Sequence, residues 1–124
     1  MEFKSAINSY KDLIVWQKSM ELIAEVYKLT KQYPREELYI LARETKRSAI
    51  SIPSNIAEGS RRSTKKDYRQ FLLMAYASDA ELETQIEIAK RVLNDCVLDF
   101  TKIDSLLKEV MRMLNKLTHE LEQY

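Results

Sequence analysis

Apolar residues recur three and four positions apart along most of the chain, a spacing that places them on one face of an α-helix. Four segments show the pattern. The stripe of the second consists of Leu38, Leu41, Thr45, Ser48, Ile52 and Ile56, and that of the third of Tyr68, Leu72, Ala75, Asp79, Leu82, Ile86, Ala89 and Leu93. The last is the most regular, with Ile103, Leu107, Val110, Leu114, Leu117, Leu121 and Tyr124. The 124 residues include one glycine and two prolines, so little in the composition interrupts long helices. The sequence therefore predicts an all-α protein.

Three short breaks separate the four predicted helices. They lie at Tyr33-Pro34, at Gly59 to Thr64, and at Asn94 to Asp99. Proline cannot continue a helix, whereas Gly59 is expected to close the second helix in a left-handed conformation. Ser63 or Thr64 is expected to cap the third helix, and Asp99 or Thr101 the fourth. Short connections favour antiparallel neighbours, so residues 1–124 are predicted to form one domain, an up-down-up-down four-helix bundle.

The first predicted helix carries two apolar stripes, rotated by about 130° from each other. Leu13, Trp16, Met20, Ile23 and Tyr27 form the first stripe, which supplies one bundle seam. Val15, Leu22, Val26, Leu29 and Tyr33 form the second. Either both neighbouring helices cover this wide arc, or part of it contacts another subunit. We expect self-association.

The second helix contains a proline and a group of short polar residues. Pro53 removes a backbone donor and clashes with the carbonyl of Ala49, so it is expected to kink the helix. Ser48, Ser51, Ser54 and Asn55 surround it, and such side chains readily bond to nearby backbone groups. No residue here resembles a nucleophile paired with a base. We therefore expect these residues to shape the chain and to carry no chemistry.

Positive charge is concentrated in the middle of the chain, although the net charge is only +1. The segment 43–69 has a net charge of +5, from Arg43, Lys46, Arg47, Arg61, Arg62, Lys65, Lys66 and Arg69 against three acidic residues. Such a run is either a solvated face or an anion-binding patch. Ser63 and Thr64 begin a helix whose free amides also attract phosphate. These eight residues are the predicted nucleic-acid-binding site, which would contact the backbone of RNA or DNA.

The segment from Asp79 to Glu87 has the opposite charge. Asp79, Glu81, Glu83 and Glu87 occur there without a basic residue. Together with the wide apolar arc, this acidic segment motivates an alternative function, an assembly scaffold for a protein partner. The three glutamates are interpreted as surface carboxylates, and a di-metal bundle would need two Glu-x-x-His motifs, which a single histidine cannot supply. We predict no metal, no cofactor and no catalytic residue.

The fourth helix contains the one pattern that suggests an enzyme. Arg112 and His119 have six residues between them and lie on nearly one helical face. This spacing resembles the Arg-x(4–6)-His pattern of HEPN ribonucleases, which implies work on an RNA phosphate. Met113 departs from that pattern, because the family usually has a polar residue there. A HEPN-like ribonuclease is the third functional hypothesis.

The run from Arg47 to Gly59, RSAISIPSNIAEG, carries a family resemblance. It is similar to the hallmark segment of the bacterial four-helix bundle proteins encoded in 23S ribosomal RNA intervening sequences. The runs LIVWQKSM at 13–20 and AELETQ at 80–85 resemble the family's first and third helices, although Ala77 stands where glycine is expected. The resemblance implies a homopentameric ring. It also implies kinship with the accessory variability determinants of diversity-generating retroelements, which bind nucleic acid beside a reverse transcriptase.

Cysteine content and hydropathy indicate the compartment. The single cysteine, Cys96, has no partner for an internal disulfide, and no apolar run approaches the roughly 20 residues that span a bilayer. We expect a cytoplasmic protein with no membrane partner. Its expected partners are further copies of itself, nucleic acid and, through the family resemblance, a reverse transcriptase. The sequence does not choose between RNA and DNA.

Overall fold

The computed structural model describes residues 9–122, and the described part contains helices and no strand. The long helices are α2 (Ile14–Thr30), α3 (Arg43–Ser60), α4 (Lys65–Val92) and α5 (Thr101–Glu122). The shorter elements are the 3-10 helices η1 (Tyr10–Asp12) and η2 (Arg35–Glu37) and a π-helical turn, η3 (Leu38–Ala42). Tyr124, predicted to end the fourth helix, lies outside the described residues.

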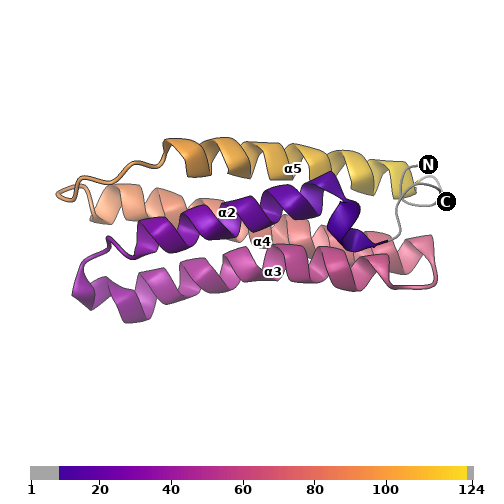
Figure 1. Ribbon diagram of the computed structural model, residues 1–124, viewed down its shortest axis with the longest axis horizontal. Coiled ribbons are helices and arrows are strands. Elements are labelled where there is room, and N and C mark those ends of the chain that lie inside the picture. The colour runs from indigo at the N-terminus through magenta and orange to yellow at the C-terminus, as the bar shows by residue number, and fades with distance from the viewer. Residues whose placement is uncertain (1–8, 123–124) are drawn as a thin grey trace.

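The four long helices lie side by side, and each runs opposite to the one before it (Figure 1). Each packs against its neighbour in the chain, and α2 completes the arrangement by packing against α5. The predicted up-down-up-down four-helix bundle is therefore confirmed. The α3–α4 turn lies at the end of the bundle where the chain enters α2 and leaves α5, and the other two connections lie at the opposite end.

The core consists of the predicted stripes of α3, α4 and α5 together with one stripe of α2. Its largest fully buried side chains include Leu22, Ile52, Ile56, Leu72, Leu82, Ile86 and Leu114. Burying each such side chain stabilises the fold by about 1.5–3 kcal/mol. The periodicity thus identified the inward faces of these three helices correctly.

The roles predicted for the two stripes of α2 are reversed only in part, because Leu13 of the first stripe is also buried. Val15, Leu22 and Val26 of the second stripe are buried, whereas Met20 and Tyr27 of the first are 42% and 38% exposed. Ser19, between Val15 and Leu22, is also fully buried, and its hydroxyl donates to the carbonyl of Trp16 at 2.7 Å. A satisfied hydroxyl can be buried at little cost, so a serine interrupts the apolar pattern of the face that enters the core.

The prediction for Gly59 was wrong. Gly59 lies inside α3, one residue before its end, and no described residue has a positive φ. A Cβ atom on Gly59 would lie 2.7 Å from the Cβ of Phe71 and 3.1 Å from Cδ1 of Tyr68. Glycine is therefore required because α3 approaches α4 closely at this point, not because the helix needs a left-handed end.

The predicted caps of α4 and α5 are present. The Thr64 side chain accepts a hydrogen bond from the Asp67 amide at 3.1 Å and so caps α4. Asp99 accepts from the Thr101 amide at 3.0 Å at the start of α5, and this bond is the main cause of the lowered pKa of Asp99. These caps satisfy amides that have no partner within the helix.

Pro53 is buried inside α3, and the helix continues through it. The surrounding polar residues bond as expected: Ser54 donates to the Ile50 carbonyl at 2.8 Å, and Asn55 donates to the Ser51 carbonyl at 2.9 Å. The Ser51 hydroxyl also lies 2.8 Å from that of Ser78 on α4. The group therefore shapes α3 and joins it to α4.

Candidate nucleic-acid interface

Four basic residues converge where α3 passes into α4. Arg61 and Arg62 follow the last residue of α3, and Lys65 and Lys66 begin α4. Arg61, Arg62 and Lys66 are exposed, and Lys65 is half-buried. We call these four residues the basic turn. Because only four residues, 61–64, connect the two helices, the four cations share one end of the bundle.

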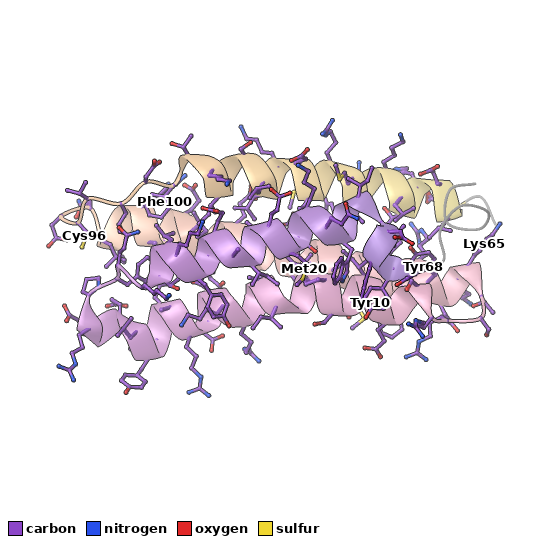
Figure 2. The ribbon with its side chains drawn as sticks, viewed as in Figure 1. Tyr10, Met20, Lys65, Tyr68, Cys96 and Phe100 are labelled. Carbon is purple, nitrogen blue, oxygen red and sulfur yellow. The ribbon has the colours of Figure 1, made fainter. Side chains whose placement is uncertain are left out.

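Arg61 is held by an aromatic pair from the start of the described chain. Its guanidinium carbon lies 5.5 Å from the ring centroid of Tyr10. Tyr10 in turn packs edge-on against Trp16, with the ring centroids 5.4 Å apart and an interplanar angle of 65°. Figure 2 shows Tyr10 in the same half of the bundle as Lys65. These contacts restrict the arginine while leaving it exposed to solvent.

Arg62 is held by two contacts. Its guanidinium carbon lies 4.5 Å from the ring centroid of Phe71 on α4, and Nη2 lies 3.1 Å from Oε2 of Glu58 on α3. Its side chain is 45% exposed. An exposed ion pair of this kind adds at most about 1 kcal/mol of stability. Its effect here is mainly on where the guanidinium lies.

Lys65 and Lys66 lie at the amino terminus of α4. The amides of a first helical turn carry a partial positive charge that adds to the charge of nearby side chains. The negative charge of the Asp67 side chain opposes this field. The Asp67 backbone amide is occupied by its hydrogen bond to the Thr64 side chain. The basic turn therefore combines four side-chain cations with a helix end, an arrangement that attracts phosphate groups.

Three of the predicted binding residues lie elsewhere. Arg43, Lys46 and Arg47 are in the first two turns of α3, and the 14 residues from Arg47 to Arg61 span about 21 Å of helix. Arg47 pairs with Glu44 at 3.4 Å. The structure thus divides the predicted cluster into two groups at opposite ends of α3.

Arg69, the remaining predicted residue, joins α4 to α5. Its Nε donates to the Thr118 carbonyl at 3.0 Å, and Nη2 lies 3.6 Å from Oε1 of Glu122. The Arg69 side chain is 32% exposed. It is thus engaged in holding two helices together, and the basic turn excludes it.

The comparison with protein families agrees with the fold. Residues 11–116 match the model of the 23S rRNA-intervening sequence protein family. The chain belongs to this family. No curated protein matches the sequence. The match covers all of α2, α3 and α4 and most of α5, so the matched segment spans most of the bundle.

Asp79 does not belong to an acidic surface, although it falls within the acidic segment of the sequence. It is fully buried, and neither carboxylate oxygen has a hydrogen-bond partner. Burial, with a smaller contribution from Glu83, raises the pKa of Asp79 to about 7. The sequence signal was its position in the apolar stripe of α4, between Ala75 and Leu82. Asp79 is a core residue and not part of a charged surface.

The remaining residues of the acidic segment are bonded or exposed as the sequence predicted. Glu81 accepts a hydrogen bond from Ser48 at 2.9 Å. Glu87 pairs with Lys90 and Arg91, and these bonds lower the pKa of its carboxyl group. No group of three or more metal-binding side chains occurs between residues 9 and 122.

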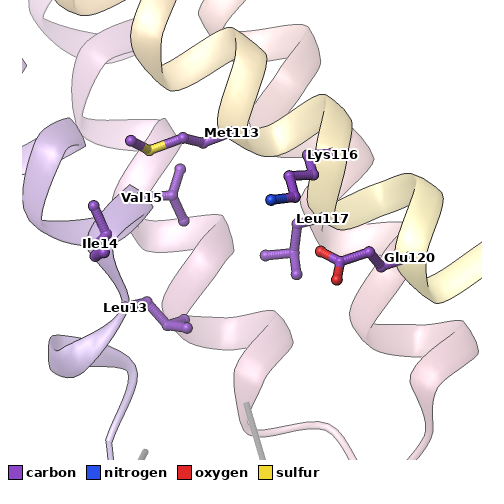
Figure 3. A pocket seen from close by; sticks show the side chains of 7 residues that line it. All are labelled: Leu13, Ile14, Val15, Met113, Lys116, Leu117 and Glu120. Carbon is purple, nitrogen blue, oxygen red and sulfur yellow. The ribbon is translucent and has the colours of Figure 1, made fainter. Parts of the chain in front are cut away.

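Arg112 and His119 are both exposed on α5, and their separation of seven positions places them on nearly one helical face. His119 Nδ1 lies 2.8 Å from the carbonyl of Asn115 within the same helix. A nearby groove of about 210 Å³ between α2 and α5 includes neither residue (Figure 3). Its lining consists of Leu13, Ile14, Val15, Met113, Lys116, Leu117 and Glu120. The histidine is thus outside this groove, with one ring nitrogen engaged by its own helix.

Among residues 9–122, no helix is long and apolar enough to cross a membrane. The basic turn is the site of interest.

Proposed function

We propose that the protein is a noncatalytic, oligomeric nucleic-acid-binding protein that contacts the phosphates of RNA or DNA through the basic turn. The observation that carries the proposal is the convergence of Arg61, Arg62, Lys65 and Lys66 at the amino end of α4. The family name refers to 23S rRNA, which agrees with an association with nucleic acid. Arg43, Lys46 and Arg47 lie near the start of α3, away from the basic turn, and are not included in the proposed contact surface.

Binding by phosphate contacts should depend strongly on salt, because each neutralised phosphate releases counterions. With four contacts, affinity is expected to fall by roughly 50- to 150-fold between about 50 and 200 mM salt. A ring of subunits would repeat the basic turn and increase the field that a polyanion meets. The family resemblance favours a pentamer.

Self-association is supported by apolar side chains on the outside of the bundle. Met20 and Tyr27 on α2 and Ile50 on α3 are 42%, 38% and 44% exposed. Monomers seldom leave large contiguous apolar patches in water. We assign Met20 and Tyr27 of α2 to a contact between subunits. Light scattering of the purified protein would test this assignment.

The decisive experiment replaces all four residues of the basic turn with alanine. Fluorescence anisotropy with labelled RNA and DNA at low salt should show loss of binding. A matched variant, with Arg43, Lys46 and Arg47 changed to alanine, should retain most of the affinity because it leaves the turn intact. Unchanged affinity for both RNA and DNA in the quadruple variant would reject the proposal.

An assembly scaffold for a protein partner is the second candidate. It is favoured by Tyr39 and Ile40 of the π-helical turn, which are 82% and 67% exposed at the end of the bundle away from the basic turn. Retention of a protein partner, together with failure to bind nucleic acid at low salt, would support this function instead.

The ribonuclease hypothesis predicts that Arg112 and His119 act together on RNA. His119→Ala should then eliminate cleavage of a labelled RNA by the purified protein. Cleavage that persists in this variant would remove the assignment, and absence of cleavage by the wild type would agree with the noncatalytic proposal.

A further inference from the structure

We infer that the two arginines of the basic turn are stacking surfaces for unpaired bases, so that the ligand is single-stranded nucleic acid. This inference rests on the proposed function and adds the class of ligand. It depends on a difference within the basic turn: two of its cations are planar and lie over aromatic rings, and the other two are lysines.

The contacts of Arg61 and Arg62 come from two different elements. Tyr10 of η1 lies beside Arg61, and Phe71 of α4 lies beside Arg62, with centroid distances of 5.5 and 4.5 Å. Both rings are half-buried, whereas both arginines are exposed. Each guanidinium therefore has a ring close to it, and each arginine side chain remains accessible from solvent.

A guanidinium held in this way differs from an ammonium in what it recognises. It is planar and weakly hydrated, and it stacks on aromatic faces, whereas an ammonium acts as a point charge. Two other cations that lie over rings are lysines, with Lys46 at 5.1 Å from Tyr27 and Lys90 at 5.7 Å from Phe100. Those pairs offer no planar surface to a ligand.

The two forms of nucleic acid present different groups to such a surface. Within a duplex the bases are stacked on one another, and phosphates are the groups most readily met by a protein. In single strands and loops, unstacked bases can pack on aromatic rings or on arginine planes. Phosphate contacts from Lys65 and Lys66 would then position the backbone while Arg61 and Arg62 hold the bases.

Restriction of the arginines lowers the cost of binding. A free arginine loses rotamer freedom when a ligand fixes it, and a side chain that is already held loses less. Arg62 is restrained by both Phe71 and Glu58, and Arg61 by a ring that itself packs on Trp16. Tyr10 and Phe71 are thus positioning residues.

The test compares two oligonucleotides with the same phosphates, one of which lacks bases. The probes are an oligothymidylate of about 12 nucleotides and an abasic strand of equal length, a size within the range of common single-strand sites. Anisotropy at low salt should show the oligothymidylate binding about tenfold or more tightly, since one stacked base contributes on this scale. A duplex of equal length should also bind more weakly than the oligothymidylate.

The variant that isolates stacking keeps the charge. In the variant Arg61→Lys with Arg62→Lys, the ratio of the affinity for the oligothymidylate to the affinity for the abasic strand should fall towards one. The affinity for the abasic strand itself should stay within about twofold of the wild-type value. Its matched control, Arg43→Lys with Arg47→Lys, should keep the full preference. Tyr10→Leu should also weaken the preference, and Phe100→Leu, which removes the ring beneath Lys90, should not.

The outcomes separate the two proposals. Equal affinity of the wild type for the abasic strand and the oligothymidylate, lost on changing the basic turn to alanine, would overturn stacking and leave phosphate binding intact. An undiminished preference in the double lysine variant would also overturn it. Failure of the wild type to bind any of the three probes would reject phosphate binding and stacking together, whereas binding of the duplex alone would overturn stacking only.

Discussion

The basic turn and the middle of α4 place charge in opposite environments. The turn keeps exposed cations at a helix end, with Arg61 and Arg62 resting on rings. The middle of α4 buries Asp79 completely, with no hydrogen bond to either carboxylate oxygen. Charge in water costs the fold little, whereas a buried unpaired charge is expensive. Changes at the turn should therefore affect binding, and changes at Asp79 should affect stability.

The largest expected effect concerns Asp79 and pH. Its pKa of about 7 in the fold lies above the ordinary value of 3.8, so the folded state binds the proton more tightly than the unfolded state. This contribution to stability is fully present below about pH 4 and is lost as pH rises through 7. Urea unfolding should show a loss of up to about 4 kcal/mol attributable to this group by pH 9.

The control for this prediction is Asp79→Asn, which cannot ionise. Its stability should vary little between pH 5 and 9, a window in which carboxyl groups with lowered pKa values, such as Glu25 and Glu87, stay charged. A wild-type stability that is constant over this window would contradict the prediction. Nucleic-acid affinity of the variant at pH 7 should match that of the wild type.

The next effect concerns the packing that supports the turn. Gly59→Ala places a methyl group 2.7 Å from Phe71 Cβ, so α3 and α4 must separate. Overpacking costs about 1–3 kcal/mol, which the better helix propensity of alanine offsets by about 1 kcal/mol. Thermal unfolding should thus show a net loss of up to about 2 kcal/mol.

Ser54→Ala is the matched change on the exposed side of the same helix. It removes only a local bond to the Ile50 carbonyl and should alter stability by less than about 0.5 kcal/mol. A Gly59→Ala variant more stable than the wild type would show that α3 and α4 do not approach as closely as described.

The smallest expected effect is on the stability of the quadruple alanine variant of the basic turn. It loses an exposed ion pair, Arg62 with Glu58, and two contacts with aromatic rings. These losses sum to about 1–3 kcal/mol. Removing the repulsion among four neighbouring cations offsets part of this sum, so the free energy of unfolding should fall by about 1 kcal/mol while binding is expected to be lost. A much larger loss would mean that the basic turn maintains the fold. Binding would then have to be judged from the variant Arg61→Lys with Arg62→Lys, which keeps the charge of the turn.

The sequence predicted the bundle because its spacing of three and four reports which side of each helix is apolar. It could not assign the two stripes of α2, because both are apolar and differ only in rotation. The stripe that enters the core contains Ser19, and a serine in the sequence suggests a surface position. In the structure Ser19 is buried with its hydroxyl hydrogen-bonded. Gly59 misled for a similar reason: close helix packing and a left-handed cap both require glycine.

The candidate site was predicted in part. Arg61, Arg62, Lys65 and Lys66 converge because a four-residue turn reverses the chain. Arg43 and Arg47 do not join them, since an unbroken helix places them far along its axis. The contacts of Arg61 with Tyr10 and of Arg69 with α5 link residues distant in the chain, and no local pattern reveals them.

The α3–α4 turn and the α4–α5 connection lie at opposite ends of the bundle, so a fluorescent label on the second lies far from the basic turn. Cys96 lies in the α4–α5 connection, at the end of the bundle away from the basic turn (Figure 2). A maleimide dye there would report tumbling on a nucleic acid without touching the surface that binds it. Partial burial and Asp95 raise the pKa of the Cys96 thiol, so coupling should proceed faster in mildly alkaline buffer.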